Sequence, residues 1–271
     1  TTGNRNTSVG YNAGSSHTTA NDNTACGRQA LVLNTTGDNN CAFGNSALEQ
    51  NTTADNNSAF GFYALALNTT GSENTAVGRQ ALGANTTASN NTALGYYALY
   101  ANTTGASNTA VGAYTLDANT TGDYNTAMGQ GALTVASTAQ SNTAIGRASL
   151  HLTTTGDNNS AVGKDSLYNN TTGSANTSLG VSALGNNTTA SNNTAVGYNS
   201  LLANTTGTSN TAVGYQALNA NTTNSHNTAV GYQALLNNDA QYNTAVGKDA
   251  VRTNTSGSRL VGVGNRALYS N

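Results

Sequence analysis

Apolar and polar residues recur along this chain with a period of seventeen residues. A unit of the general form Asn-Thr/Ser-Ala-x-Gly begins at Asn6 and returns at every seventeenth residue up to Asn227. One residue is then lost, and the last two units begin at Asn243 and Leu260. The sixteen units start at residues 6, 23, 40, 57, 74, 91, 108, 125, 142, 159, 176, 193, 210, 227, 243 and 260. A fixed period of this length indicates a repeat architecture.

We number the columns of the repeat from 0, the first Asn, to 16. Column 4 is Gly in all sixteen units, column 3 is always apolar, and column 8 is Leu in fourteen units. Column 2 is Ala or another small residue, and column 11 is Asn in most units. The unit is too short for a helical hairpin, and its Gly and Asn content disfavours helix. The pattern therefore predicts an all-β, parallel β-solenoid of about sixteen coils of seventeen residues, with short strands joined by tight corners.

We expect the coils to form one domain, residues 1–271, because a single coil buries too little apolar surface to be stable alone. At roughly 4.8 Å per coil, the stack would be about 77 Å long. Within each strand, columns 1 and 3 point to one side and column 2 to the other. We expect columns 3 and 8, such as Val213 and Leu218, to meet in the core. The small residues of column 2 leave two interpretations open: a face where subunits meet, or the inside of a thin coil.

Asn dominates columns 0 and 11, where stacked coils would place identical side chains above one another. This predicts hydrogen-bonded ladders, and Asn tolerates the left-handed backbone of a corner. The invariant Gly of column 4 indicates a positive φ or a close neighbour. Column 11 also matches the N-glycosylation pattern, which makes these residues candidate glycan acceptors: Asn34, Asn51, Asn68, Asn85, Asn102, Asn119, Asn170, Asn187, Asn204 and Asn221.

The composition narrows the function further. Only 7% of residues are charged and the formal net charge is −2, so there is no basic footprint for nucleic acid. The chain has no apolar run long enough for membrane insertion. Cys26 and Cys41 occupy different columns, so no disulfide is implied. The chain begins at Thr1 without an initiator Met, and we interpret it as a processed product or a segment of something longer.

No catalytic constellation is visible. The three histidines fall in different units and columns, and three of the four aspartates in column 15 lie two or more units apart. These residues are His17, His151, His226, Asp38, Asp123 and Asp157. Calcium-binding repeats of the Gly-Gly-x-Gly-x-Asp kind are absent from the sequence. We therefore expect no enzyme activity, no metal site and no cofactor.

Column 5 holds five of the nine Lys and Arg residues and is expected to face solvent. Tyr198, Tyr215 and Tyr232 follow one another in this column and are predicted to stack. Such a stripe favours either of two roles, binding of sugar rings or simple stabilisation of the solenoid face. Ice binding is a third hypothesis. It is disfavoured because the Thr residues of columns 12 and 13 are adjacent, so only one of each pair points outward.

The two ends of the chain have no polar, proline-bearing or helical cap, although open strand edges invite pairing. The sequence Ala267–Asn271 followed by Thr1–Gly3 reads as an uninterrupted repeat. This predicts that subunits stack head to tail into an open filament. A cut from a longer fibre protein is the competing account. The predicted interface comprises Thr1, Thr2, Gly3, Arg5, Gly14, Leu260, Val261, Arg266, Leu268, Tyr269 and Asn271.

The unit Asn-Thr-Ala-Val-Gly-x-x-Ala-Leu, as at Asn210–Leu218, resembles the head repeats of YadA-type trimeric autotransporter adhesins. It is more similar still to repeat arrays in phage tail-fibre proteins. The likeness covers all sixteen units, although this repeat is longer than that of the autotransporters. The resemblance implies a left-handed β-roll and a trimeric adhesin or tail-fibre shaft with a surface- or glycan-binding role.

These observations lead to one main expectation. The chain is a structural subunit of an extracellular fibre or filament, at a cell surface or on a virion, and its partner is itself. A homotrimeric adhesin or fibre shaft with surface glycans as partners is the alternative, and an ice-binding solenoid is less favoured. Neither nucleic acid nor membrane insertion is expected.

Overall fold

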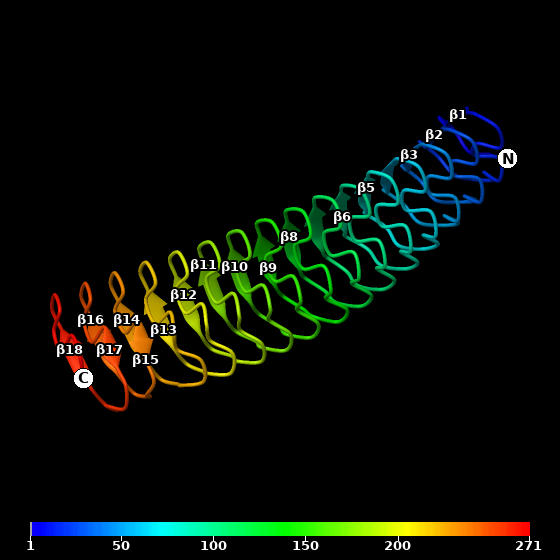
Figure 1. The fold of residues 1–271 in the computed structure, drawn as a ribbon. Coiled ribbons are helices and arrows are strands. Elements are labelled where there is room, and N and C mark those ends of the chain that lie inside the picture. The colour runs from blue at the N-terminus through cyan, green and yellow to red at the C-terminus, as the bar shows by residue number, and fades with distance from the viewer. Residues whose placement is uncertain (1) are drawn as a thin grey trace. The chain divides into compact units, whose positions relative to one another are not determined.

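The computed structural model describes residues 2–271 and contains strands, turns and loops but no helix over that range. It divides into two compact units, Thr1–Ala139 and Gln140–Asn271, and we describe each by itself. The expectation of one continuous domain stays a prediction. Both units confirm the expected architecture, because in each of them the coils stack as a parallel β-solenoid (Figure 1).

The first unit contains one strand per coil, in the order β1 to β8 across the sheet. Every strand pairs in parallel with the next, and each residue faces the residue seventeen positions later, as Thr75 faces Thr92. The strands are β1 (Thr7–Val9), β2 (Thr24–Cys26), β3 (Cys41–Phe43), β4 (Ser58–Phe60), β5 (Thr75–Val77), β6 (Thr92–Leu94), β7 (Thr109–Val111) and β8 (Thr126–Met128).

The second unit repeats this arrangement in the order β9 to β14, then β16 and β18. A second, two-stranded sheet of β15 and β17 forms where the lost residue shortens one coil. The strands are β9 (Thr143–Ile145), β10 (Ser160–Val162), β11 (Thr177–Leu179), β12 (Thr194–Val196), β13 (Thr211–Val213), β14 (Thr228–Val230), β15 (Asn237–Asn238), β16 (Thr244–Val246), β17 (Thr253–Asn254) and β18 (Val261–Val263).

The core assignment was right for column 8 and wrong for column 3. The leucines of column 8 are buried except Leu268 in the last coil, and they face the alanines of column 2, which are buried as well. A Cβ built at Gly262, in column 2, would lie 2.5 Å from Cγ2 of Val251, in column 8. Column 3 points outward, and Phe43 and Phe60 are each 39% exposed. The interior is too narrow for a second large side chain, because leucine and two asparagine columns already fill it. Column 2 therefore lines a thin coil and is no subunit face.

The column 8 leucines adopt a left-handed backbone, as at Leu48 with φ 51° and Leu218 with φ 52°. This conformation costs a non-glycine residue roughly 1–2 kcal/mol. Burying a leucine side chain contributes about 1.5–3 kcal/mol. Burial therefore outweighs the backbone strain, and the strained corner persists because it turns the side chain into the core.

The glycines of column 4 are required on both grounds expected from the sequence. Gly214 has φ 138°, in a region that L side chains rarely adopt. A Cβ at this position would lie 2.4 Å from the carbonyl oxygen of Gly231 in the next coil. The coils therefore approach each other more closely at this corner than any side chain allows.

Candidate interaction surfaces

Two ladders of buried asparagine hold the coils together, as expected. In column 0, Asn57 donates its backbone N–H to Oδ1 of Asn40 at 3.0 Å. In column 11, Asn68 donates from Nδ2 to Oδ1 of Asn51 at 3.0 Å. Both Asn57 and Asn68 also donate from Nδ2 to the carbonyl oxygen of Gly71, at 3.0 and 2.8 Å. Each rung thus links a coil to its predecessor and closes the corner of its own coil.

The candidate glycosylation positions lie inside this ladder. All ten are 0% exposed, and a glycan would have to be attached to a side-chain nitrogen that points into the core. For example, Nδ2 of Asn85 donates to Asn68 Oδ1 at 2.9 Å and to the carbonyl of Ala88 at 3.0 Å. The folded coil therefore has no room for a glycan at these positions: Asn34, Asn51, Asn68, Asn85, Asn102, Asn119, Asn170, Asn187, Asn204 and Asn221.

The column 11 ladder is interrupted within the first unit. Oδ1 of Asn119 is buried and has no hydrogen-bond partner. In the other rungs this oxygen accepts an amide of the following coil, but column 11 of that coil is Ala136. A buried carbonyl oxygen without a donor destabilises the fold.

The aspartates of column 15 have a structural role. Asp38 accepts the backbone N–H of Asn21 at 2.6 Å, and Asp123 accepts that of Ala106 at 2.7 Å. Asp157 accepts the N–H of Gln140 at 2.7 Å. Each carboxylate thus caps the same corner of the preceding coil, and these three residues are not gathered into one site.

The three histidines are also kept apart. His151 stacks on Tyr168 and His226 on Tyr242, each with ring centroids 5.0 Å apart, and they belong to coils four repeats apart. His17 occupies the asparagine column of the first coil, where burial lowers its pKa. Its Nε2 is buried and has no hydrogen-bond partner among the described residues.

Both cysteines are free thiols on the outward face of neighbouring strands. Cys41 pairs with Thr24, two residues before Cys26, so the thiols are diagonal neighbours. Diagonal neighbours lie about 7–8 Å apart, too far for a disulfide without backbone movement. Partial burial raises the pKa of the Cys41 thiol.

The tyrosines of column 5 stack as expected. The ring centroids of Tyr198 and Tyr215 are 5.5 Å apart, and those of Tyr215 and Tyr232 are 5.2 Å apart, with interplanar angles of 11° and 7°. Nζ of Lys248 lies 5.8 Å from the Tyr232 ring centroid. Because the rings cover one another's faces, mainly their edges and hydroxyls meet solvent. This geometry favours the stabilising role over stacking on sugar rings.

A second group of tyrosines lies on the first unit and was missed from the sequence. Tyr96, Tyr97, Tyr100 and Tyr114 contact one another with centroids 4.6 to 5.9 Å apart, mostly at tilted or edge-on angles. A hydrogen bond with Tyr96 is the main cause that raises the pKa of Tyr114. The adjacent pair Tyr96–Tyr97 in the sequence was the available signal for this cluster.

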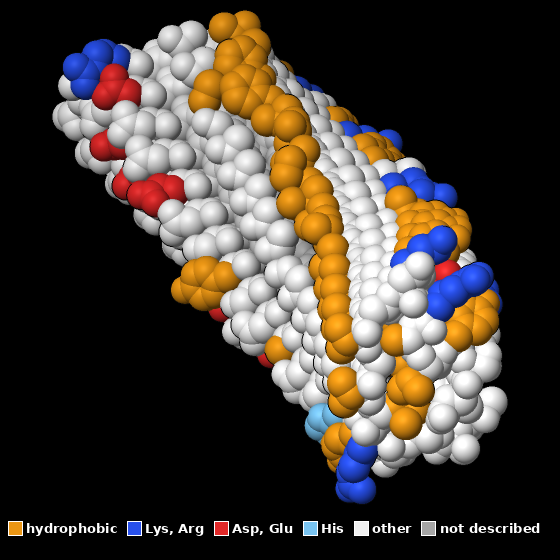
Figure 2. Space-filling view, turned by 90° about the vertical axis from the view of Figure 1, so that its left-hand side faces the viewer, with side chains coloured by type: hydrophobic (Ala, Val, Ile, Leu, Met, Phe, Trp, Pro, Cys, Tyr) orange, Lys and Arg blue, Asp and Glu red, His pale blue; other side chains and the backbone are white. Residues whose placement is uncertain are grey.

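Column 3 forms a surface that the sequence analysis placed in the core. We call its outward side chains the apolar stripe; in the first unit they are Val9, Cys26, Phe43, Phe60, Val77, Leu94, Val111 and Met128. Figure 2 shows it as a narrow line of hydrophobic side chains. The column 1 residues beside it are Thr, Ser or Cys in this unit, and none of the eight strands contains a charged residue.

The threonines of columns 12 and 13 differ in exposure. The column 12 hydroxyls are used within the stack, as Thr35 Oγ1 donates to the carbonyl of Thr52 at 2.9 Å, whereas Thr36 is exposed. The two adjacent threonines of a coil therefore do not form the array of two outward threonines per coil that ice binding would need.

The end coils carry the residues proposed for subunit contact. Thr2 and Gly3 donate to the carbonyl of Thr18 at 2.8 and 3.3 Å, and Arg5 forms a 2.6 Å ion pair with Asp22. Gly14, with φ 55°, replaces the usual leucine. At the other end, Leu260 is half-buried, whereas Val261 and Leu268 are exposed. Asn271 donates a hydrogen bond to Asn254 at 3.3 Å. The guanidinium of Arg266 lies 5.2 Å from the Tyr269 ring centroid. Thr1 lies outside the described residues.

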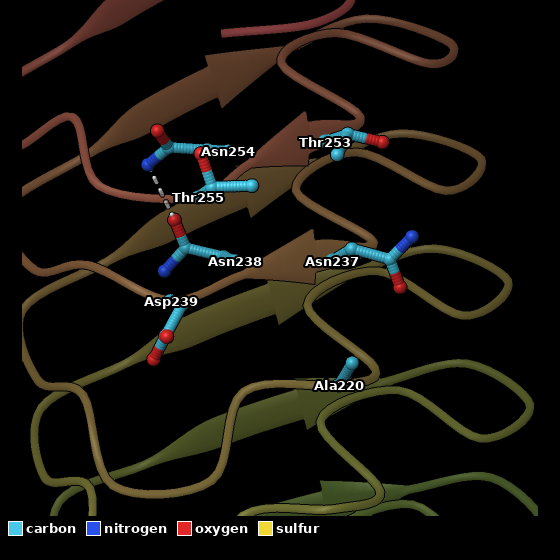
Figure 3. Close-up of a pocket in the computed structure, with 7 residues that line it drawn as sticks. All are labelled: Ala220, Asn237, Asn238, Asp239, Thr253, Asn254 and Thr255. Atoms are coloured by element: carbon cyan, nitrogen blue, oxygen red, sulfur yellow. Dashed lines mark hydrogen bonds between the residues drawn. The ribbon is translucent and has the colours of Figure 1, made fainter.

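A small pocket of about 220 Å³ lies beside β15 and β17 in the second unit (Figure 3). It is lined by Ala220, Asn237, Asn238, Asp239, Thr253, Asn254 and Thr255. Asn254 donates to Asn238 Oδ1 at 2.9 Å, so the ladder continues past it. Asp239 is the one charged group of the lining, which gives the pocket no set of convergent ligands.

Among the described residues, no three His, Cys, Asp or Glu side chains gather in a way that could hold a metal ion. Over the same residues, no helix is long and apolar enough to cross a membrane. No family model matches the sequence, and comparison with curated proteins and with solved structures finds no similar protein. The fold defines the class of the protein as a parallel β-solenoid.

Proposed function

We propose that the chain is a structural subunit of an extracellular fibre, in which the last coil of one copy pairs with the first coil of the next. The observation that carries this proposal is the match between the open edges of β1 and β18. Within each unit, neighbouring coils pair edge to edge, while the coils of β1 and β18 each leave one edge without a partner among the described residues. An open, regular strand edge is a template for pairing with another chain.

The backbone groups at the two edges are complementary. Between internal coils, the N–H of Gly27 donates to the carbonyl of Val9 at 2.8 Å, and that of Gln29 donates to Tyr11 at 2.9 Å. At the first edge the equivalent donors, Gly10 and Asn12, have no backbone acceptor among the described residues. At the other edge the equivalent acceptors are the carbonyls of Val263 and Asn265, which receive no N–H there. Stacking one copy on another would satisfy all four groups.

The side-chain ladder supports the same pairing. His17 and Asn271 both occupy column 11, and Asn271 continues the ladder by donating to Asn254 Oδ1 at 3.3 Å. In a stacked pair, the unpartnered Nε2 of His17 would face Oδ1 of Asn271 of the preceding copy. The column 0 ladder would instead be interrupted, because Leu260 replaces asparagine. The contact between two copies would thus be weaker than the contact between two coils within one chain.

Gly264 offers a selective test. A Cβ at the internal Gly247 would meet the Gly264 carbonyl oxygen at 2.5 Å, whereas a Cβ at Gly264 has its nearest neighbour at 4.0 Å. Gly264→Ala therefore adds a methyl group that a following coil would meet, and its φ of 125° also strains the alanine locally. The control, Asn265→Ala, changes an exposed side chain of the same coil.

We expect the natural chain and Asn265→Ala to form fibres in electron micrographs, and Gly264→Ala to remain unstacked with an unchanged circular dichroism spectrum. Fibres of Gly264→Ala as long as those of the natural chain would disprove pairing at this edge. A natural chain that never stacks at high concentration would disprove the proposed function.

A further inference from the structure

We propose that the apolar stripe is a lateral interface for a second copy of this chain, with both copies pointing in the same direction. The proposal goes beyond the end-to-end contact and involves different residues. The apolar stripe also replaces column 2 as the candidate surface for side-by-side contact, since the small side chains of column 2 are buried.

The first argument is the character and size of the surface. The eight strands of the first unit carry no charge, so covering their outward face removes no ion from water. Phe43 and Phe60 are each 39% exposed. An aromatic side chain has about 200 Å² of surface, so each ring offers about 80 Å². Together with the column 1 side chains beside it, the stripe of this unit reaches an exposed area of several hundred Å², approaching the roughly 800 Å² per partner of a standard interface.

The second argument is periodicity. The stripe presents one apolar side chain per coil at the strand spacing of a parallel sheet, about 4.8 Å. A partner that contacts it continuously needs side chains at the same spacing over many strands. Another copy of the same stripe has this spacing along its whole length.

The third argument is the charge on the two flanks of the stripe, which also fixes the direction of the partner. On the side that precedes the strands lie Asp38, Asp55 and Glu73, and on the side that follows them lie the exposed Arg28 and Arg79. In Figure 2, acidic side chains gather along one flank, which also has basic side chains near its ends, and basic side chains gather along the other flank. Rotating one copy about an axis parallel to the coil stack brings the acidic flank of each copy opposite the basic flank of the other. Glu73 and Arg79 flank the same strand, β5, and would therefore meet at the same height.

The opposite orientation of the partner lacks this complementarity. A rotation about an axis perpendicular to the stack would keep each flank on its own side. The same-direction arrangement therefore pairs unlike charges and is also compatible with a fibre of one polarity.

The experiment uses the Gly264→Ala chain, in which end-to-end stacking is blocked, and measures molar mass by light scattering after size exclusion. If the natural chain itself does not stack, the natural chain serves as the background, so the two proposals are tested separately. We expect twice the chain mass of 27.3 kDa. A mass of 27.3 kDa at high concentration would overturn the proposal.

Two sets of variants then locate the interface. Phe43→Glu with Phe60→Glu should weaken the association at least about tenfold, because it places charges in the apolar contact. Thr53→Glu with Thr70→Glu adds the same charge to exposed positions of the same two coils and should leave the mass unchanged. Equal effects of the two pairs would overturn the assignment to the stripe.

A charge exchange tests the direction of the partner. Arg79→Glu should weaken the association several-fold, and adding Glu73→Arg should restore it. Thermal unfolding of the single variant serves as a control, because Arg79 also lies 5.7 Å from the Phe62 ring centroid and 5.8 Å from that of Tyr96. Failure of the exchange to restore association, in a chain that remains folded, would overturn the same-direction arrangement.

Discussion

Leu218 combines complete burial with a left-handed backbone, and replacing it tests how these two effects balance. The side chain is 0% exposed with φ 52°. We expect Leu218→Ala to destabilise its coil by about 2–5 kcal/mol through the cavity that it leaves. Shortening further to Gly removes one buried methyl, about 0.8 kcal/mol, and adds freedom to the unfolded chain, about 0.4–1 kcal/mol. Gly also escapes the roughly 1–2 kcal/mol of left-handed strain.

These terms nearly cancel, so Leu218→Gly should match Leu218→Ala in stability to within about 1 kcal/mol. The neighbouring Ala217 is equally buried but has no positive φ, so it provides the control. Ala217→Gly releases no strain and should cost about 1.5 kcal/mol. Native-state hydrogen exchange of the amides in this coil measures the stability change caused by each substitution, because repeat proteins open locally. An Ala-to-Gly step at 218 as costly as that at 217 would refute the strain argument. Leu218→Asp, which buries a charge, should open the coil altogether, and unchanged thermal stability would contradict the core assignment.

Three further predictions concern the ladders and corners. Ala136→Asn should raise the unfolding free energy by about 1 kcal/mol, because its amide would donate to the unpartnered Oδ1 of Asn119; no gain in a denaturant titration would contradict this. Burial lowers the His17 pKa, so the unfolded chain binds the proton first and the first coil should lose stability as the pH falls below about 6.5. His17→Gln should remove that dependence in hydrogen exchange. Gly214→Ala should prevent the two coils from stacking, since its Cβ would lie 2.4 Å from the Gly231 oxygen. Cooperative unfolding at the melting temperature of the unsubstituted chain would refute this.

The repeat period and the asparagine columns were predictable because each depends on stacking identical coils. A parallel register of seventeen residues places every column above itself, and this alone produces the ladders of Asn57 and Asn68. The φ of Gly214 followed from the same reasoning, since an invariant glycine at a corner has few other causes.

The inward side of the strand was not predictable from alternation. Alternation separates Ala212 from Val213, but it does not say which of them faces the core. Hydrophobicity favours valine inside, and the narrow interior selects alanine instead. Size variation was the overlooked signal: column 3 ranges from Val77 to Phe60, whereas column 2 stays small. A tightly packed interior does not tolerate such changes in volume.

The left-handed leucines were also beyond a sequence argument. Propensity excludes leucine from this backbone region, and only burial within the completed stack overrides it. The apolar stripe was missed for a related reason, since an outward apolar column resembles a core column until the coil is closed.

An electron cryomicroscopy reconstruction of the assembled chain tests the central claim most directly. The proposal predicts fibres in which the strand spacing of about 4.8 Å continues across the subunit boundary. At that boundary the Gly10 N–H should donate to the Val263 carbonyl, as Gly27 does to Val9 at 2.8 Å within the chain. Separate particles, or fibres whose subunits meet without pairing of β18 and β1, would contradict the proposal.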